Sequence, residues 1–311
     1  MNLFIGAAAI GFILALLALG VFVSYRIYHT LDLTTDGSFG IGAAVVAALL
    51  VKGVHPLPAS LAATAAGLAA GAVTGLVHTQ FLVSALLAGI LTSTALYSVS
   101  LFVMGSGNLS LVSADSLATI AERVLRLPDS VTLLGTPVSG GSLATLILMA
   151  LLTLAVAVAV GLFLATDLGL AMRAAGNNPQ MAKAVAINVD WMIVLGLSVS
   201  NGLIALSGAL LAQYEGFANI QMGIGTVVTG IAMLLVGETL LGRRTLTRSL
   251  AGAVAGTVVY RLIVAAAIRA GLSPNALKLV TASLVLAVLV LPQLGRRARR
   301  ARMMEGVEGG I

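Results

Sequence analysis

The side chains that could carry out catalysis are few in this sequence and poorly grouped. Asp32 and Asp36 are the one pair of neighbouring carboxylates that suggests acid–base chemistry, and His29 is the only histidine near them. The three histidines have no spacing typical of a metal site, and cysteine is absent. The phosphate-binding pattern GxxxxGK[ST] is also missing. An enzyme is expected to show a stronger constellation, so we expect no catalytic residue and no metal ligand.

Two charged residues stand inside apolar stretches of the chain. Glu238 and Arg261 occur in consecutive apolar segments. Ionisable groups in such segments are costly and usually face a partner or a cavity. Two interpretations remain open, namely that the two residues pair with each other across a helix bundle, or that they take part in gating.

Other polar residues suggest contacts with a solute or between helices. Asp36 and Ser38 precede an apolar, glycine-containing run; Asp36 is expected to be the N-cap of the following helix. This stretch could instead line a translocation pathway, where irregular polar backbone is tolerated. Asn201 and Thr229 could donate hydrogen bonds to a passing solute, although polar residues in such segments hold helices together by default.

The composition requires a membrane environment. Of the 311 residues, 59% are hydrophobic and only 9% are charged, against about 25% charged residues in soluble domains. We expect an all-α polytopic membrane protein with about nine transmembrane or membrane-embedded helices, because about 20 apolar residues cross a bilayer as a helix. The nine segments are 3–25, 37–52, 57–77, 81–104, 143–165, 190–213, 223–242, 249–269 and 276–293. The second and seventh contain glycines and are expected to be broken or tilted.

The charges at the C-terminus predict the orientation. We divide the chain into a transmembrane domain, 1–294, and a basic tail, 295–311, whose arginines are typical of a cytoplasmic anchor against anionic lipid rather than of nucleic-acid binding. A cytoplasmic tail places the loops 26–36, 78–80, 166–189 and 243–248 in the cytoplasm and the N-terminus outside.

The long external connection, 105–142, contains an amphipathic pattern. Five apolar residues recur at helical spacing before Pro128 ends the pattern: Leu117, Ile120, Ala121, Val124 and Leu127. The helix could simply lie at the membrane surface, or it could form part of a platform for an external partner.

The loop 166–189 contains a second short helix. Asn178 is a good N-cap and Pro179 suits the first helical position, and "PQMAKAVAI" then gives about two turns before Asn188. Two turns are barely stable in water, so the helix must be docked. It either packs on its own membrane domain or is held by a second protein.

The sequence from 166 to 211 resembles the signature region of ABC-importer permeases of the branched-chain amino acid and ribose type, in their less characterised single-permease branch. The matching positions include Arg173, Asn178 and Pro179, whereas Ala186 stands where a glycine is common. The segment "LDLTTDGSFGIGAAVVAALL" gives a second, weaker match, and the resemblance covers about residues 5–290. In that family this loop is the coupling helix, which sits in a cleft of a cytoplasmic ATPase subunit.

The resemblance implies a permease subunit of a binding-protein-dependent importer in the bacterial inner membrane. The expected partners are a second copy of the chain, two cytoplasmic ATP-binding subunits and an external solute-binding protein. The chain itself would bind no cofactor, and the partner subunit would hydrolyse ATP. Asn178, Pro179, Gln180 and Lys183 are expected to form the ATPase contact, with Arg173 fixing the loop. Aromatic amino acids are the first expectation for the solute and sugars the second; a self-sufficient secondary transporter or channel is the alternative.

Overall fold

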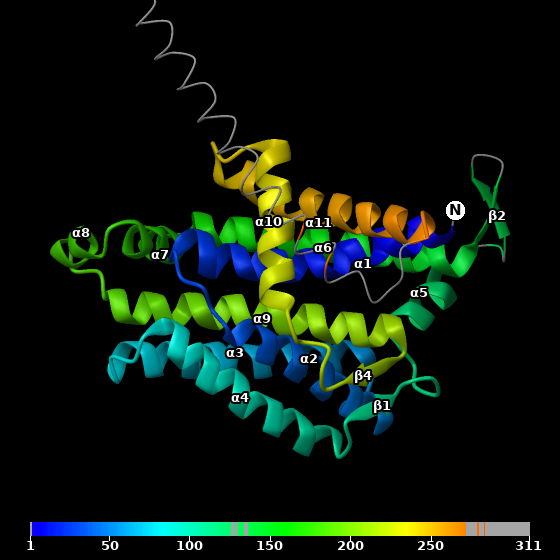
Figure 1. Ribbon diagram of the computed structural model, residues 1–311, viewed down its shortest axis with the longest axis horizontal. Helices are drawn as coiled ribbons and strands as arrows, with labels where there is room; N and C mark the ends of the chain where they lie inside the picture. Colours follow the sequence, from blue (N-terminus) through cyan, green and yellow to red (C-terminus); the bar gives the residue numbers. More distant parts are fainter. Residues whose placement is uncertain are drawn as a thin grey trace, which may run out of the picture.

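The computed structural model describes residues 2–125, 128, 130–133, 136–271, 279 and 283. Within them the chain is built of long helices lying side by side (Figure 1). Among the described residues, seven helices are long and apolar enough to cross a membrane: Asn2–Val21 (α1) continued by Phe22–Ile27 (η1), Thr34–Val51 (α2), Pro56–Gln80 (α3), Ala85–Met104 (α4), Gly140–Ala165 (α6), Val189–Glu215 (α9) and Leu246–Arg269 (α11). The multi-pass helical fold expected from the composition is therefore confirmed.

The expected number of nine spanning helices needs correction. The seventh predicted segment forms only a 16-residue helix, α10 (Thr226–Leu241), preceded by non-helical turns at 220–225. The second segment is not broken, because α2 is a continuous helix that begins at Thr34. The ninth predicted segment, 276–293, and the basic tail lie outside the described residues apart from Leu279 and Ser283.

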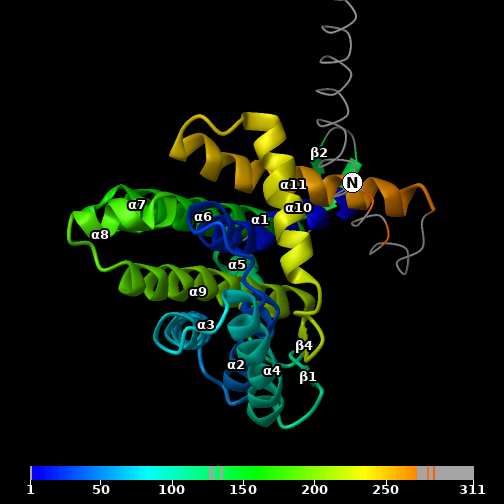
Figure 2. The same cartoon turned by 60° about the vertical axis from the view of Figure 1, so that its left-hand side comes forward.

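The connections between the helices gather at the two ends of the bundle. One end carries the short helices α7 (Asp167–Asn177) and α8 (Pro179–Ala184), and we call it the α8 end. The other carries two small antiparallel sheets and α5 (Leu117–Leu125), and we call it the sheet end (Figures 1 and 2). Its strands are β1 (Asn108–Ser110), which pairs with β4 (Phe217–Asn219), and β2 (Ser130–Leu133), which pairs with β3 (Thr136–Ser139).

Local capping explains where several helices begin. The side chain of His55 accepts a hydrogen bond from the second residue of α3, with Pro56 at the first helical position. Ser84 caps α4, Asn188 caps α9 and Thr245 caps α11 in the same manner. Polar residues in the short connections therefore fix the ends of helices whose bodies are almost wholly apolar.

Glycines set how closely the helices pack. α9 lies against α1, α2 and α3. A Cβ atom added to Gly42 of α2 would lie 2.0 Å from the carbonyl oxygen of Ala205, and one added to Gly71 of α3 would lie 2.1 Å from that of Leu197. Such contacts are open only to a residue without a side chain, and they let backbones approach as in other membrane bundles. α9 is therefore the helix around which this half of the bundle is assembled.

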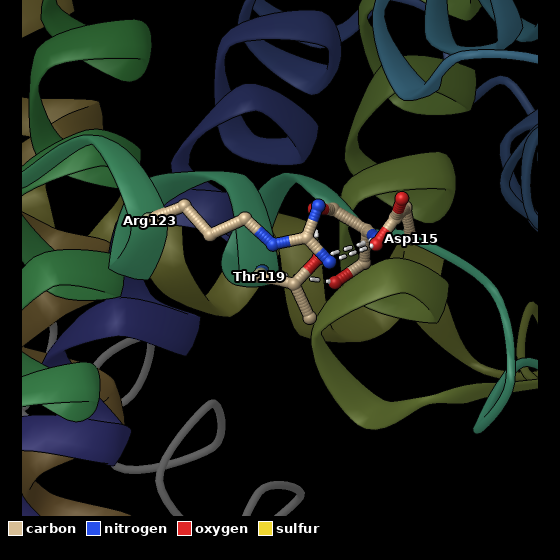
Figure 3. A network of polar contacts seen from close by, with 4 residues as sticks. Asp115, Thr119 and Arg123 are labelled. Atoms are coloured by element: carbon tan, nitrogen blue, oxygen red, sulfur yellow. Dashed lines mark hydrogen bonds and ion pairs between the residues drawn. The ribbon is translucent and has the colours of Figure 1, made fainter.

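The amphipathic pattern in the long connection forms α5 at the sheet end, as predicted. Ser116 and Thr119 exchange hydrogen bonds between side chain and backbone at its start, and Arg123 pairs with Asp115 at 2.7 Å (Figure 3). Leu117 is buried and its backbone N–H donates to the side chain of Gln213 in α9. Thus α5 is anchored on the bundle by one face, while the Asp115–Arg123 pair stays exposed. Leu127, the last residue of the predicted pattern, lies outside the described residues.

Candidate coupling surface and translocation pathway

The predicted short helix in the loop 166–189 is present and starts where the sequence indicates. The side chain of Asn178 accepts a hydrogen bond of 3.0 Å from the backbone of Met181, and Pro179 occupies the first turn. The helix ends at Ala184, one turn earlier than the pattern suggested. Its end is closed by a hydrogen bond of 3.0 Å from the backbone N–H of Ile187 to the carbonyl of Ala182.

Ala186 occupies the left-handed region that this helix ending requires. Its φ is +60°, a conformation that costs a residue with a Cβ about 1–2 kcal/mol. The sequence departs from the resembled family at this position, where a glycine is common, and the departure has a physical meaning. The loop keeps the glycine backbone conformation although alanine fills the position.

Most of α8 faces outward. Ala182 is 2% exposed and packs with Ala175 of α7 and Val189 of α9. Met181 and Val185, in contrast, are 66% and 61% exposed. A further set of exposed residues surrounds them: Asn178, Pro179, Gln180 and Lys183. One small side chain therefore docks the helix on its own domain, and the rest of its surface remains uncovered.

α7 connects this exposed helix to the first membrane helix. A Cβ atom on Gly176 would lie 2.0 Å from the carbonyl oxygen of Ile27, so α7 touches the end of η1 directly. The Tyr28 hydroxyl, just beyond η1, donates to the carbonyl of Met192 in α9. Arg173 is partly buried, and its buried Nε has no hydrogen-bond partner among the described residues. The loop is thus fastened to the ends of both α1 and α9.

Glu238 does not pair with Arg261, so the predicted pair is wrong. Its side chain is 2% exposed and lies in an ion pair with Arg243, at 2.7 Å, and with Arg26, at 3.1 Å. Both arginines belong to the α8 end, because Arg26 is in η1 and Arg243 follows α10. Since these two residues sit in or beside loops, the pairing was not visible from the apolar segments alone.

Arg261 lies elsewhere in the bundle. It interacts electrostatically with Tyr260, its neighbour in α11, and with Glu215 at the end of α9, and its buried Nε has no hydrogen-bond partner within the described part of the chain. A role of either residue in gating stays a prediction, but the two would act at separate places.

Asp36 is a helix cap, although for a different helix than expected. α2 begins at Thr34, before Asp36, and has no side-chain cap. The carboxylate of Asp36 instead accepts hydrogen bonds of 3.0 Å from the backbone of Gly225 and Val227 and of 2.9 Å from the hydroxyl of Thr226. It therefore neutralises the positive start of α10, 190 residues further along the chain.

A second buried carboxylate, Asp32, joins α9 to the segment before α2. It accepts hydrogen bonds from the side chain of Asn201, at 2.7 Å, and from the backbone of Thr34, at 2.9 Å. Because Asn201 is near the middle of α9, the segment 28–33 must descend from the α8 end to about half the depth of the bundle.

The remaining predicted pathway residues face the protein. Thr229 donates its hydroxyl to the carbonyl of Gly225, one turn back in its own helix. Ser38 is fully buried, and its hydroxyl has no partner among the described residues. Of the residues that the sequence predicted for the translocation pathway, Asp36 is the one that lines a described cavity, which lies at about half the depth of the bundle.

That cavity has a volume of about 60 Å³ and is bounded by α2, α4 and the turn at 220–224. Sequence reasoning missed the contribution of α4, which is Ser93, Tyr97 and Ser100. The signal was present, because "TSTALYSVS" concentrates hydroxyls in the middle of an apolar segment. Hydroxyl residues are common in packed membrane helices, so the run alone did not distinguish packing from a pathway.

Comparison with known proteins gives the family. Residues 3–291 match the family described as branched-chain amino acid transport system, permease component. The chain is 36% identical to a tyrosine transport system permease protein of Clostridioides difficile (strain R20291), over 91% of this chain and 88% of that protein. It is 31% identical to an uncharacterized protein of Rickettsia prowazekii (strain Madrid E), over 90% and 94% of the two chains. No solved structure matches. The chain therefore belongs to the family of permease components of branched-chain amino acid transport systems, and it is a transport subunit rather than an enzyme.

Proposed function

We propose that this chain is the membrane permease of a binding-protein-dependent ABC importer for a small amino acid-like solute, driven by partner ATPase subunits. The observation that carries the proposal is the exposed, capped helix α8 at one end of the bundle. An aromatic amino acid is the first candidate for the solute, because a relative 36% identical over most of its length is a tyrosine transport system permease. Sugars are the second candidate.

The surface of α8 has the character of a protein interface. Met181 and Val185 are apolar, mostly exposed and part of the loop beyond the spanning helices. Exposed apolar side chains rimmed by polar ones are typical of interaction sites. We assign the contact with the ATPase to Asn178, Pro179, Gln180 and Lys183, with these two apolar residues at its centre and with Arg173 holding the loop.

The contacts of α7 and α8 provide a route by which ATPase closure could move the spans. Gly176 touches η1, and Ala182 packs beside Val189 at the start of α9. A push on α8 would therefore tilt α1 and α9 together, and α9 in turn lies against α2 and α3. Small shifts of packed helices are a common way of amplifying a local movement.

The proposal includes an assembly and an orientation. Two copies of the chain would form the pathway, two ATP-binding subunits would lie in the cytoplasm at the α8 end, and a solute-binding protein would dock at the sheet end in the extracytoplasmic space. ATP would be hydrolysed by the partner subunits, with no cofactor bound to this chain. At the sheet end, a cleft of about 510 Å³ beside α5 includes His55, Asp115 and Arg123 and offers polar contacts to the binding protein.

The proposed contact is tested on the complex of the chain with its ATPase. Replacing Met181 by Ala together with Lys183→Glu should reduce the ATPase that co-purifies with the chain by about tenfold or more, since loss of a central contact has effects of this size. Uptake of L-tyrosine into cells should fall in parallel. The control is Lys52→Glu, which alters an exposed lysine at the sheet end.

The rival function makes the opposite prediction. A secondary transporter or channel would move solute without nucleotide. If the purified chain alone accumulated L-tyrosine in vesicles under an ion gradient, or if the Met181→Ala, Lys183→Glu double variant retained the ATPase and full uptake, the proposed importer would be wrong.

A further inference from the structure

The middle of α4 carries polar groups that the described bundle does not satisfy. Ser93, Tyr97 and Ser100 line the cavity of about 60 Å³ between α4, α2 and the turn at 220–224. None of the three hydroxyls has a hydrogen-bond partner among the described residues. Ser100 is nevertheless 2% exposed, whereas Tyr97, at the edge of the cavity, is 48% exposed.

The depth of these residues makes the missing partners significant. α4 has 20 residues, and Tyr97 is close to its midpoint, so it lies near the centre of the hydrocarbon layer if α4 spans the membrane. Lipid chains cannot accept or donate hydrogen bonds, and an unsatisfied polar group there costs several kcal/mol. Water, a solute or another protein chain must therefore reach this face of α4.

The backbone around the cavity favours a pathway over simple helix packing. The turns at 220–225 are non-helical, and both α2 and α10 begin here rather than at an end of the bundle. Irregular backbone at membrane depth is found where it is buried in protein or lines a cavity, and in transporters it marks the binding site. Gly223 lies so close to Asp36 that an added Cβ would be 1.9 Å from its carbonyl oxygen, so the turn packs tightly against the start of α2.

We infer that Ser93, Tyr97 and Ser100 line the solute path at the middle of the membrane. The site would take a small amphipathic solute with both hydrogen-bonding groups and an apolar body. The three hydroxyls would bind the polar groups, while the Tyr97 ring, Ile220 and Ile224 would contact the apolar part. The assignment rests on the proposed transport function and refines its substrate class, since an amino acid with a large apolar side chain has this chemistry.

The cavity in this structure is closed to such a solute. A volume of 60 Å³ has room for a few water molecules but not for an amino acid. Opening requires the turn at 220–224 to separate from α4. Because Asp36 binds the first residues of α10, this turn and α10 would move together with the start of α2 or break that contact.

The natural absence of cysteine permits a direct test with single-cysteine variants. Ser93→Cys and Ser100→Cys change little volume and keep the packing, and Tyr97→Cys places a thiol at the mouth of the cavity. Each is expressed with its ATPase and treated in membranes with a charged, membrane-impermeant thiol reagent. Labelling should be at least about tenfold faster than at apolar positions on the same helix, because the reactive thiolate forms only in contact with water. L-tyrosine, as the probe, should slow it several-fold.

Leu91→Cys and Phe102→Cys are the matched controls, since both residues are exposed, apolar and part of α4. If the three polar positions react no faster than these two in complexes that still take up L-tyrosine, the pathway does not run along this face. Slow labelling that becomes fast only when the copies of the chain are dissociated would likewise overturn the assignment and indicate a helix interface. Uptake without an ATPase would contradict the proposed function. The labelling result would still test whether these residues line the solute path.

Discussion

Single polar residues in this protein act over long sequence separations. Asp36 holds the first turn of α10, Asp32 holds Asn201 in the middle of α9, and Glu238 joins the end of η1 to the residue Arg243 after α10. In an apolar bundle the cost of an unpaired charge is high, so each buried carboxylate has found a partner from another element. These bonds hold α10 at its start and near its end, and this short helix runs crosswise to the long helices (Figures 1 and 2).

The pairing of Glu238 can be measured with a double-mutant cycle. Glu238→Gln and Arg26→Gln should show a coupling of about 1–2 kcal/mol, less than for a fully buried pair because Arg26 is 31% exposed. Unfolding by SDS in mixed micelles gives the free energies. Glu238→Gln and Arg261→Gln should be additive within about 0.5 kcal/mol. A clear coupling with Arg261 and none with Arg26 would restore the pair that the sequence suggested.

The packing of the helices depends on backbone contact more than on side-chain interlock. α3 presents glycines at 67, 71 and 75, one per turn, and an added Cβ at any of them would collide with α9. Helices that meet in this way are held by dispersion over a large area and by precise approach. The same arrangement between α10 and α11, where a Cβ on Gly237 would lie 1.9 Å from the carbonyl of Gly252, connects α10 to the rest of the bundle.

Gly71→Ala should therefore destabilise the protein although alanine is the better helix former. The methyl group must displace the carbonyl of Leu197, and we expect a loss of about 2 kcal/mol, as for other overpacked sites. Thermal unfolding in detergent measures it. Gly107→Ala is the control, because an added Cβ there meets nothing within 4 Å, and it should change the unfolding free energy by less than about 0.5 kcal/mol. Equal effects of the two substitutions would show that close packing on α9 is not limiting.

At the scale of the whole molecule, the two ends of the bundle have different characters. The α8 end carries the exposed helix and the Glu238 ion pairs, and the sheet end carries α5 with its exposed Asp115–Arg123 pair (Figures 1 and 3). The loops predicted to share one side lie together at the α8 end; they are 26–36, 78–80, 166–189 and 243–248. The first of them then continues to about half the depth of the bundle, where α2 starts. Their cytoplasmic location is part of the proposal.

Cysteine labelling tests that orientation. Gln180→Cys in α8 and Ser113→Cys before α5 are exposed sites at opposite ends. In cells with a permeabilised outer envelope but an intact inner membrane, an impermeant thiol reagent should label Ser113→Cys and should reach Gln180→Cys only after the inner membrane is opened. The reverse pattern would invert the assigned orientation and remove α8 from contact with any cytoplasmic ATPase.

The sequence by itself determined the environment, the positions of most spanning helices and the start of α8, because these depend on local properties: long apolar runs, an asparagine cap and a proline at the first helical position. The grouping of the loops at the two ends of the bundle could also be predicted from the sequence, because each helix long enough to cross the membrane brings the chain to the opposite side. Partners of buried charges could not be predicted in this way. Asp36 caps a helix 190 residues away, and Glu238 pairs with loop arginines rather than Arg261, because pairing depends on which helices are neighbours. The polar face of α4 could be assigned to a cavity only from the tertiary structure, which places the turn at 220–224 against it at about half the depth of the bundle. Helix packing, rather than any local sequence pattern, brings these two segments together.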